Sequence, residues 1–219
     1  MTGGRGPRHA PRFVGAAGPR GLGEAAGDRK GARCSDRTLL AEEEVSRQLM
    51  TRAWIGAGSN EGDRLGFVKR GLKLLVDDPA IELATVSSLY DTAPYGVEDQ
   101  PRFLNLVAGL DTDLPAESLL ARLLEAEDRC GRVRKERWGP RTLDLDLLVY
   151  GDEMLTTDVL TVPHPGIVER AFVLVPFAEV APDVAVPGAG ATVSELLERL
   201  GDTSDVVTRI GDAPNLETS

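Results

Sequence analysis

The order of apolar patterns between residues 52 and 150 is the feature that most limits the folds open to this chain. Segments with strand-like alternation or β-branched composition are interrupted by two segments with an apolar stripe at helical spacing. The segments are RAWIGAGS (52–59), DRLGFVKRGLKLLVDD (63–78), IELATVSSLY (81–90), FLNLVAGLDT (103–112), PAESLLARLLEAEDRC (115–130) and TLDLDLLVY (142–150). Their order, β-α-β-β-α-β, predicts an α+β, ferredoxin-like core, a mainly antiparallel sheet with helices packed on it.

The remaining segments suggest how the chain is divided. Residues 1–49 are rich in Gly, Arg, Ala and Pro without a helical or strand period, so we expect a disordered N-terminal extension. The alternatives to a disordered extension are a basic arm or an organellar transit segment. Met50 could also be the original start of translation. One domain should span 50–211, with a helix or irregular segment near 165–179, a last helix TVSELLERL (192–200) and a flexible tail at 212–219.

Composition excludes several classes of protein. The net charge of −10 argues against general affinity for nucleic acid or an anionic membrane. No stretch approaches the roughly 20 apolar residues of a membrane span, and the N-terminus lacks the apolar core of a secretion signal. Cys34 and Cys130 are too few for a disulfide scaffold or a four-ligand zinc site. We therefore expect a cytoplasmic protein that binds neither nucleic acid nor membrane. We also expect it to be a monomer.

Two aspartates in the last strand-like segment are candidate metal ligands. Alternate strand residues share one face, which places Asp144 and Asp146 about 6.5 to 7 Å apart along the backbone. That spacing would let both carboxylates hold one Mg²⁺ or bridge two ions on a phosphate chain. Taken alone, the same pattern is more typical of a solvated strand face.

The loop GRVRKERWGPR directly before this strand supports the metal interpretation. It concentrates five basic side chains in an otherwise acidic chain, and guanidinium groups bind phosphate oxygens in a bidentate manner. The five are Arg132, Arg134, Lys135, Arg137 and Arg141. A solvated charge run or a small nucleic-acid patch around Trp138 are the alternatives. Next to Asp144 and Asp146, the loop favours a nucleotide polyphosphate.

Other candidate residues carry weaker signals. GAGSNEGDR (56–64) matches neither a P-loop nor a dinucleotide-binding spacing, so it is either an anion-binding turn or a turn that caps the next helix. Phe103 and Asn105 share a strand face and could stack on and hydrogen-bond a flat heterocycle, or belong to the core. Glu127 continues an apolar helix stripe, so it needs a buried partner or a path to solvent. His164, in TVPHP, is a turn residue or a site residue.

Together these segments resemble the 6-hydroxymethyl-7,8-dihydropterin pyrophosphokinase family of the folate pathway. The resemblance is strongest in RWGPRTLDLDLL and continues, in the family's order, through the other motifs between about residues 52 and 183. These are GSNEGDR, SSLYDTAPYG, QPRFLNLV, GRVRKERWGPR, LTVPHP and RAFVLVPFAEVAP.

The resemblance implies transfer of pyrophosphate from ATP to the pterin, giving the pterin diphosphate and AMP. It implies that Asp144 and Asp146 hold two Mg²⁺ ions, and that Arg132 and Arg141 are catalytic with them. The implied pterin-binding residues are Thr92, Ala93, Tyr95, Phe103, Asn105 and Phe172. The implied ATP-binding residues are Arg132, Arg134, Trp138, Arg141, Thr161, His164 and Arg170, with Glu127 supporting the arginine loop.

Two other functions fit parts of the pattern less well. A polymerase-β-like nucleotidyltransferase also combines a Gly-Ser turn with paired aspartates, but there the aspartates follow closely, whereas Ser59 and Asp144 lie far apart here. An RNA-binding ferredoxin-like domain would use aromatic residues and a basic surface on its sheet, whereas this sheet offers carboxylates.

Overall fold

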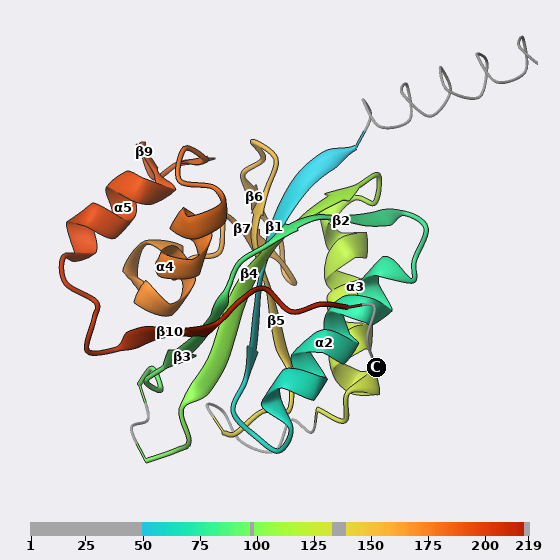
Figure 1. Cartoon of the computed structure of the whole chain (residues 1–219). Coiled ribbons are helices and arrows are strands. Elements are labelled where there is room, and N and C mark those ends of the chain that lie inside the picture. The colour runs from blue at the N-terminus through green and yellow to red at the C-terminus, as the bar shows by residue number, and fades with distance from the viewer. Residues whose placement is uncertain (1–49, 97–98, 133–138, 217–219) are drawn as a thin grey trace, which may run out of the picture. The chain divides into compact units, whose positions relative to one another are not determined.

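The computed structural model describes residues 50–96, 99–132 and 139–216 (Figure 1). The expectations for residues 1–49 and for the last residues of the C-terminal tail therefore lie outside the described residues. The same is true of Arg134, Lys135, Arg137 and Trp138 in the arginine loop.

A six-stranded sheet forms the centre of the described chain, and all of its strand pairs are antiparallel. Its path runs in the order β10-β3-β4-β1-β5, and β2 also pairs with β4. The strands are β1 (Thr51–Ser59), β2 (Ile81–Val86), β3 (Leu89–Thr92), β4 (Phe103–Thr112), β5 (Asp144–Tyr150) and β10 (Val207–Gly211). The predicted fold class is confirmed, with the ferredoxin-like core extended by β10 at one edge.

Two details of the sheet differ from the prediction. The single strand expected at 81–90 is divided into β2 and β3, because the chain bends at Ser87 and Ser88 while both strands remain paired with β4. Ser87 bridges the break, since its backbone N–H donates to the carbonyl of Val107 at 2.9 Å and its Oγ accepts from the N–H of Val107 at 3.0 Å. The strand β10 was not predicted, because its five residues are too short for a clear alternation.

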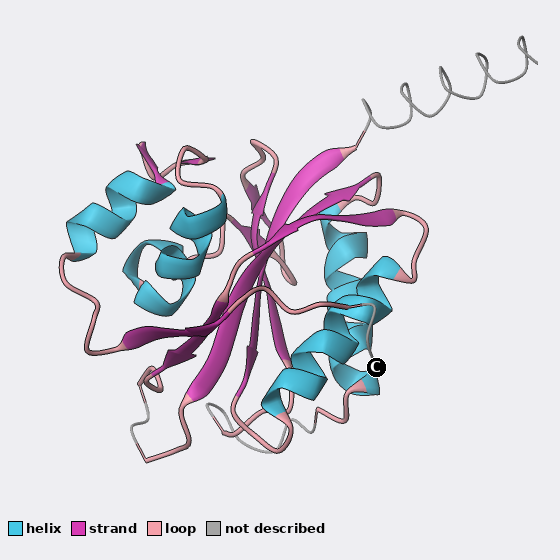
Figure 2. Cartoon of the chain, viewed as in Figure 1, coloured by secondary structure: helices cyan, strands magenta, loops and turns pink. Residues whose placement is uncertain are grey.

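Helices cover both faces of the sheet (Figures 1 and 2). On one face, α2 (Arg64–Val76) and α3 (Ala116–Arg129) pack over the apolar side chains Ile55, Leu106 and Leu145. On the other, α4 (Ala171–Val180) and α5 (Val193–Leu200) pack over Trp54 and Val107. The alternation of β1 and β4 between the two cores is the physical reason that both strands are apolar almost throughout.

Helix ends follow the local sequence. Asp63 caps α2, since its carboxylate accepts from the N–H of Gly66 at 3.0 Å, which confirms the capping interpretation of GAGSNEGDR. Thr192 and Glu195 form a capping box at α5, and Pro115 directly precedes α3.

Shorter elements fill the connections. The hairpin of β6 (Leu155–Thr156) and β7 (Thr161–Val162) follows β5, and β8 (Ala185–Val186) pairs with β9 (Ala191–Thr192) before α5. The uncertain segment near 165–179 consists of one 3-10 turn, η1 (Ile167–Glu169), followed by α4. Within the described ranges, no helix has the length and apolar character needed to cross a membrane.

Candidate active site

Asp144 and Asp146 lie on one face of β5, opposite glycines of the neighbouring strand. The register pairs Asp144 with Gly58 and Asp146 with Gly56, while Leu145 is buried on the other face. Paired residues of an antiparallel sheet share a face, so the two carboxylates border glycine hydrogens and no bulky side chain. The side chains of this strand thus alternate between leucines that pack in the core on one face and carboxylates with space beside them on the other.

A cavity of about 230 Å³ opens above this part of the sheet, at the ends of β3, β4, β5 and α4. It is lined by Thr92, Ala93, Tyr95, Gln100, Phe103, Asn105, Gly139, Arg141, Asp144, Asp146, His164, Arg170 and Phe172. All six residues that the resemblance assigned to the pterin are among them. The cavity combines aromatic rings, a buried amide and two carboxylates, which suits a flat polar heterocycle that carries a reactive group.

The amide of Asn105 is held in place at the floor of this cavity. Its Nδ2 donates to Thr92 Oγ1 at 2.7 Å, and only 9% of the residue is exposed. Gly58 lies opposite Asn105 in the sheet, and a Cβ at Gly58 would lie 2.4 Å from Asn105 Oδ1. The glycine is therefore required for the position of the amide.

A second hollow adjoins the first on the side of α3 and β7. Its lining includes Glu127, Arg132, Thr161, Val159 and Pro165. It shares four residues with the cavity, namely Arg141, Asp144, Asp146 and His164. The two spaces therefore meet at the carboxylates, where a group could pass from one bound molecule to another.

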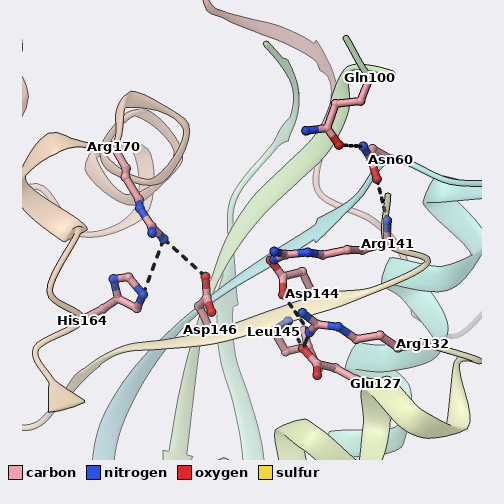
Figure 3. A network of polar contacts seen from close by, with 10 residues as sticks. All are labelled: Asn60, Gln100, Glu127, Arg132, Arg141, Asp144, Leu145, Asp146, His164 and Arg170. Atoms are coloured by element: carbon pink, nitrogen blue, oxygen red, sulfur yellow. Dashed lines mark hydrogen bonds and ion pairs between the residues drawn. The ribbon is translucent and has the colours of Figure 1, made fainter. Parts of the chain in front are cut away.

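Three arginines surround the two carboxylates (Figure 3). Arg132 Nη1 lies 2.7 Å from Asp144 Oδ1, and Arg141 Nη1 contacts Asp144 Oδ2. Arg170 Nη1 lies 3.6 Å from Asp146 Oδ2. Guanidinium groups bind phosphate oxygens in a bidentate manner, so three of them held at this junction suit a polyphosphate.

Glu127 supports this arrangement from helix α3. It is only 1% exposed, and it bonds the guanidinium of Arg132 and accepts from the N–H of Leu145 at 2.7 Å. Of the two possibilities left open by the sequence, a buried partner or a path to solvent, the structure shows the partner.

Arg170 links the carboxylates to the aromatic side of the cavity. Its guanidinium carbon lies 5.6 Å from the ring centre of Phe172 and 5.8 Å from that of Tyr95, distances typical of cation–π contacts. Its Nη1 also lies 3.5 Å from His164 Nε2. Helix α4, which carries Phe172, is anchored at its other end, where Glu179 accepts from the N–H and Oγ of Ser88 at 2.9 and 2.6 Å.

Two titratable groups at the junction have altered pKa values. Partial removal from water, followed by the charge of Asp144, raises the pKa of Asp146 to about 6. Burial, followed by the positive charge of Arg170, lowers the pKa of His164 to about 4. At neutral pH His164 is therefore an uncharged imidazole, whereas the two carboxylates repel one another and favour a cation between them.

The donor set fits Mg²⁺ that arrives with a nucleotide. Among residues 50–96, 99–132 and 139–216, no group of three or more His, Cys, Asp and Glu side chains is placed to hold a metal. Mg²⁺ is usually held by one or two carboxylates together with substrate phosphates and water, and seldom by a cage of protein groups alone. Asp144 and Asp146, at the edge of both spaces, match that requirement.

The fold and this junction define an enzyme that transfers a phosphate-containing group between two bound molecules. The sequence profile of the family described as 7,8-dihydro-6-hydroxymethylpterin-pyrophosphokinase (HPPK) matches residues 54–182. The chain belongs to this family and is a pyrophosphokinase, as its resemblance indicated.

Individual relatives agree with this assignment. The 2-amino-4-hydroxy-6-hydroxymethyldihydropteridine pyrophosphokinase of Methylorubrum extorquens is 43% identical over 151 residues, which cover 69% of this chain and 94% of the relative. The protein of the same name from Pseudomonas aeruginosa is 44% identical, over 68% of this chain and 91% of its own. A crystal structure of Plasmodium falciparum HPPK-DHPS with pteroate has a similar fold, with a TM-score of 0.56 at 13% identity, and covers 68% of this chain and 42% of its own.

Proposed function

We propose that this chain transfers pyrophosphate from ATP to 6-hydroxymethyl-7,8-dihydropterin in folate biosynthesis, giving the pterin diphosphate and AMP. The observation that carries the proposal is the meeting of two spaces at Asp144 and Asp146. One space has the aromatic and amide groups suited to a pterin, and the other has the arginines suited to a nucleotide.

The pterin would occupy the cavity lined by Phe103, Asn105 and Phe172. The two aromatic side chains can stack on its rings, and the fixed amide of Asn105 can bond its polar edge. Thr92 orients that amide, and Ala93 and Tyr95 close the same side of the cavity.

ATP would occupy the second hollow, with its phosphates directed to the shared residues. Arg132 and Arg141 would bind phosphate oxygens, and Thr161, His164 and Arg170 would contact the nucleotide from the side of β7 and α4. An uncharged His164 can exchange hydrogen bonds with the nucleotide without adding charge. Arg134 and Trp138 keep their expected contact with ATP as part of this proposal.

Asp144 and Asp146 would hold Mg²⁺, two ions on the family pattern, and bound Mg²⁺ neutralises polyphosphate charge. In the reaction, the pterin hydroxymethyl oxygen bonds to the β-phosphorus of ATP and releases its proton to solvent, while the bond from that phosphorus to the α–β bridging oxygen breaks. AMP leaves with that oxygen. The protein contributes by positioning both substrates and by stabilising charge through Arg132 and Arg141, with no covalent intermediate.

Product analysis tests the reaction. We expect AMP to form only when ATP, Mg²⁺ and the hydroxymethyl dihydropterin are all present, and pterin-independent release of AMP or phosphate would contradict the proposal. Asp144→Ala and Asp146→Ala should each lower turnover at least about 10²-fold while melting changes little. The matched control is Asp111→Ala, since Asp111 is also a strand carboxylate paired with an arginine, Arg52, and it lies on β4 away from the cavity lining.

We further propose that the enzyme works as a monomer in the cytoplasm. Residues of a single chain line both spaces, so a second subunit is not required to complete the site. Light scattering after gel filtration, at micromolar concentration with and without nucleotide, measures the mass directly.

A further inference from the structure

The side chain of Asn60, in the GSNEGDR segment, connects the two halves of the site. The residue directly follows β1 and is only 3% exposed. Its Nδ2 donates to Gln100 Oε1 at 3.1 Å, and its Oδ1 accepts from the N–H of Arg141 at 2.8 Å (Figure 3). The same Nδ2 also donates to the carbonyl oxygen of Pro101 at 3.2 Å. The backbone of Asn60 adds a fourth bond, from its N–H to the carbonyl oxygen of Arg141 at 3.1 Å.

The partners of Asn60 belong to different halves of the site. Gln100 lines the cavity, and Pro101 lies two residues before Phe103, where β4 begins. Arg141 lies at the junction of both spaces, and its guanidinium contacts Asp144. One planar amide thus spans the segment that leads into the aromatic wall and the segment that holds the phosphate-directed arginine.

We propose that Asn60 is a positioning residue that holds residues 99–102 and 139–141 in one fixed relation. This inference rests on the proposed function, since it assigns the first segment to the pterin and the second to the nucleotide. Its role is to keep the acceptor group of the pterin aligned with the polyphosphate, because a misplacement of about 1 Å can cost about 10²-fold in rate. The same link lets a ligand on the nucleotide side order the pterin side.

The chemistry of the contacts requires an amide at this position. A serine offers one oxygen and cannot reach both segments, whereas an amide presents a donor and an acceptor on opposite sides of one plane. With aspartate at 60, the bond from the N–H of Arg141 remains. Gln100 can turn its amide to donate to the carboxylate, but the carbonyl of Pro101 cannot, so two oxygens would face one another. Asn60→Asp therefore weakens the link selectively on the pterin side, because the bond to the carbonyl of Pro101 is replaced by repulsion between two oxygens.

Arg64 supplies a matched control. Its Nη1 donates to the carbonyl oxygen of Arg102 at 2.9 Å and to Asp91 Oδ1 at 3.1 Å, so it secures the same segment from helix α2. Asp91 lies on β3 and Arg102 on the segment itself, whereas Asn60 reaches across to Arg141. Arg64→Gln loosens residues 99–102, and Asn60→Asp loosens them and also weakens their link to the nucleotide side.

The first experiment separates binding from transfer. The affinities for the pterin alone and for a non-hydrolysable ATP analogue with Mg²⁺ are measured by calorimetry, and the transfer rate by single-turnover quench. We expect Asn60→Asp to change each affinity by less than about threefold and to slow transfer at least about tenfold. Arg64→Gln should change transfer by less than about threefold. Equal loss of transfer in both variants, or wild-type transfer in Asn60→Asp, would overturn the inference.

The second experiment needs no turnover. Hydrogen exchange is measured by mass spectrometry with the ATP analogue and Mg²⁺ alone. In the wild-type chain and in Arg64→Gln, bound nucleotide should slow exchange in peptides covering 139–146 and also 99–105. In Asn60→Asp, bound nucleotide should slow exchange only in the peptides covering 139–146. If nucleotide protects residues 139–146 but not 99–105 in the wild-type chain, the role of Asn60 is contradicted and the proposed function is unaffected. If the nucleotide analogue does not bind at all, the proposed function itself is contradicted.

Discussion

Glu127 of helix α3 and Arg132 form a largely buried ion pair next to the strand that carries the two aspartates. The same carboxylate also accepts from the N–H of Leu145, so Arg132 is held beside Asp144 by a group that is 1% exposed. An exposed arginine would have to be ordered at each encounter with a polyphosphate. Here helix α3 orders it in advance, which lowers the entropic cost of binding.

Glu127→Gln should therefore reduce both stability and activity. The amide keeps an acceptor for the N–H of Leu145 but removes one of the two carboxylates beside Arg132, the other being Asp144. We expect a loss of about 2 to 3 kcal/mol in the free energy of unfolding. Urea titration measures this change. Glu125→Gln is the control, because Glu125 lies on the same helix, pairs with Arg122 and is exposed, and it should cost less than about 0.5 kcal/mol. Similar losses in both variants would contradict the role given to Glu127.

Two glycines of β1 offer a second test, because they share a face but have different neighbours. A Cβ at Gly58 would lie 2.4 Å from Asn105 Oδ1, whereas a Cβ at Gly56 would lie 3.7 Å from the side chain of Leu148, an ordinary contact. Gly58→Ala should displace the amide of Asn105 and weaken pterin affinity at least about tenfold, as overpacking of a fixed group usually does.

The control for this test is Gly56→Ala, whose pterin affinity should stay within about threefold of the wild-type value. Affinity for the ATP analogue should change little in either variant, because the clash is with a residue of the pterin side. Calorimetric titration of both ligands measures these affinities. If the two substitutions lowered pterin affinity equally, Asn105 would not be a pterin-binding residue.

The pKa of His164 leads to a test of stability against pH. Burial and Arg170 lower it to about 4 in the folded chain, whereas the unfolded chain binds this proton near the ordinary value of about 6.5. Between these values the unfolded state binds more protons, so His164 should make the folded state progressively less stable as pH falls from about 6.5 to 4.

His164→Asn should remove that part of the pH dependence. The measurement is urea unfolding of both chains at several pH values without Mg²⁺ or nucleotide, and the quantity to compare is the difference between them. The difference should move in favour of the variant as the pH falls below about 6.5. Asp146 titrates in the same range in both chains and cancels in the comparison. A constant difference would mean that His164 titrates normally in the folded state.

The sequence predicted the elements whose period was long enough to read. The stripes of α2 and α3 and the alternation of β4 and β5 gave both the fold class and the face that carries Asp144 and Asp146. The bend at Ser87 and Ser88 and the strand β10 were missed, because each depends on pairing with a distant strand and leaves no local period.

The candidate site was predictable in part for a similar reason. Residues with distinctive chemistry in a recognisable motif, such as Arg141 and Phe172, could be assigned in advance. Asn60, Gln100 and Gly58 could not, because their roles arise from contacts between segments far apart in the chain. Only the capping role of Asp63 was readable within GAGSNEGDR, since a helix cap is a local interaction.

The division of the chain leads to the last test. Residues 1–49 lack a periodic apolar pattern, and the family profile begins at Trp54, so we expect a chain of residues 50–219 to retain full activity. Its kcat/KM should stay within about twofold and its Tm within about 2 °C of the full chain, because β1 remains intact. A chain that begins at Asn60 is the control. It lacks β1, the strand that pairs with both β4 and β5, and should not fold. Loss of activity or stability in the 50–219 chain would show that the N-terminal residues contribute to the enzyme.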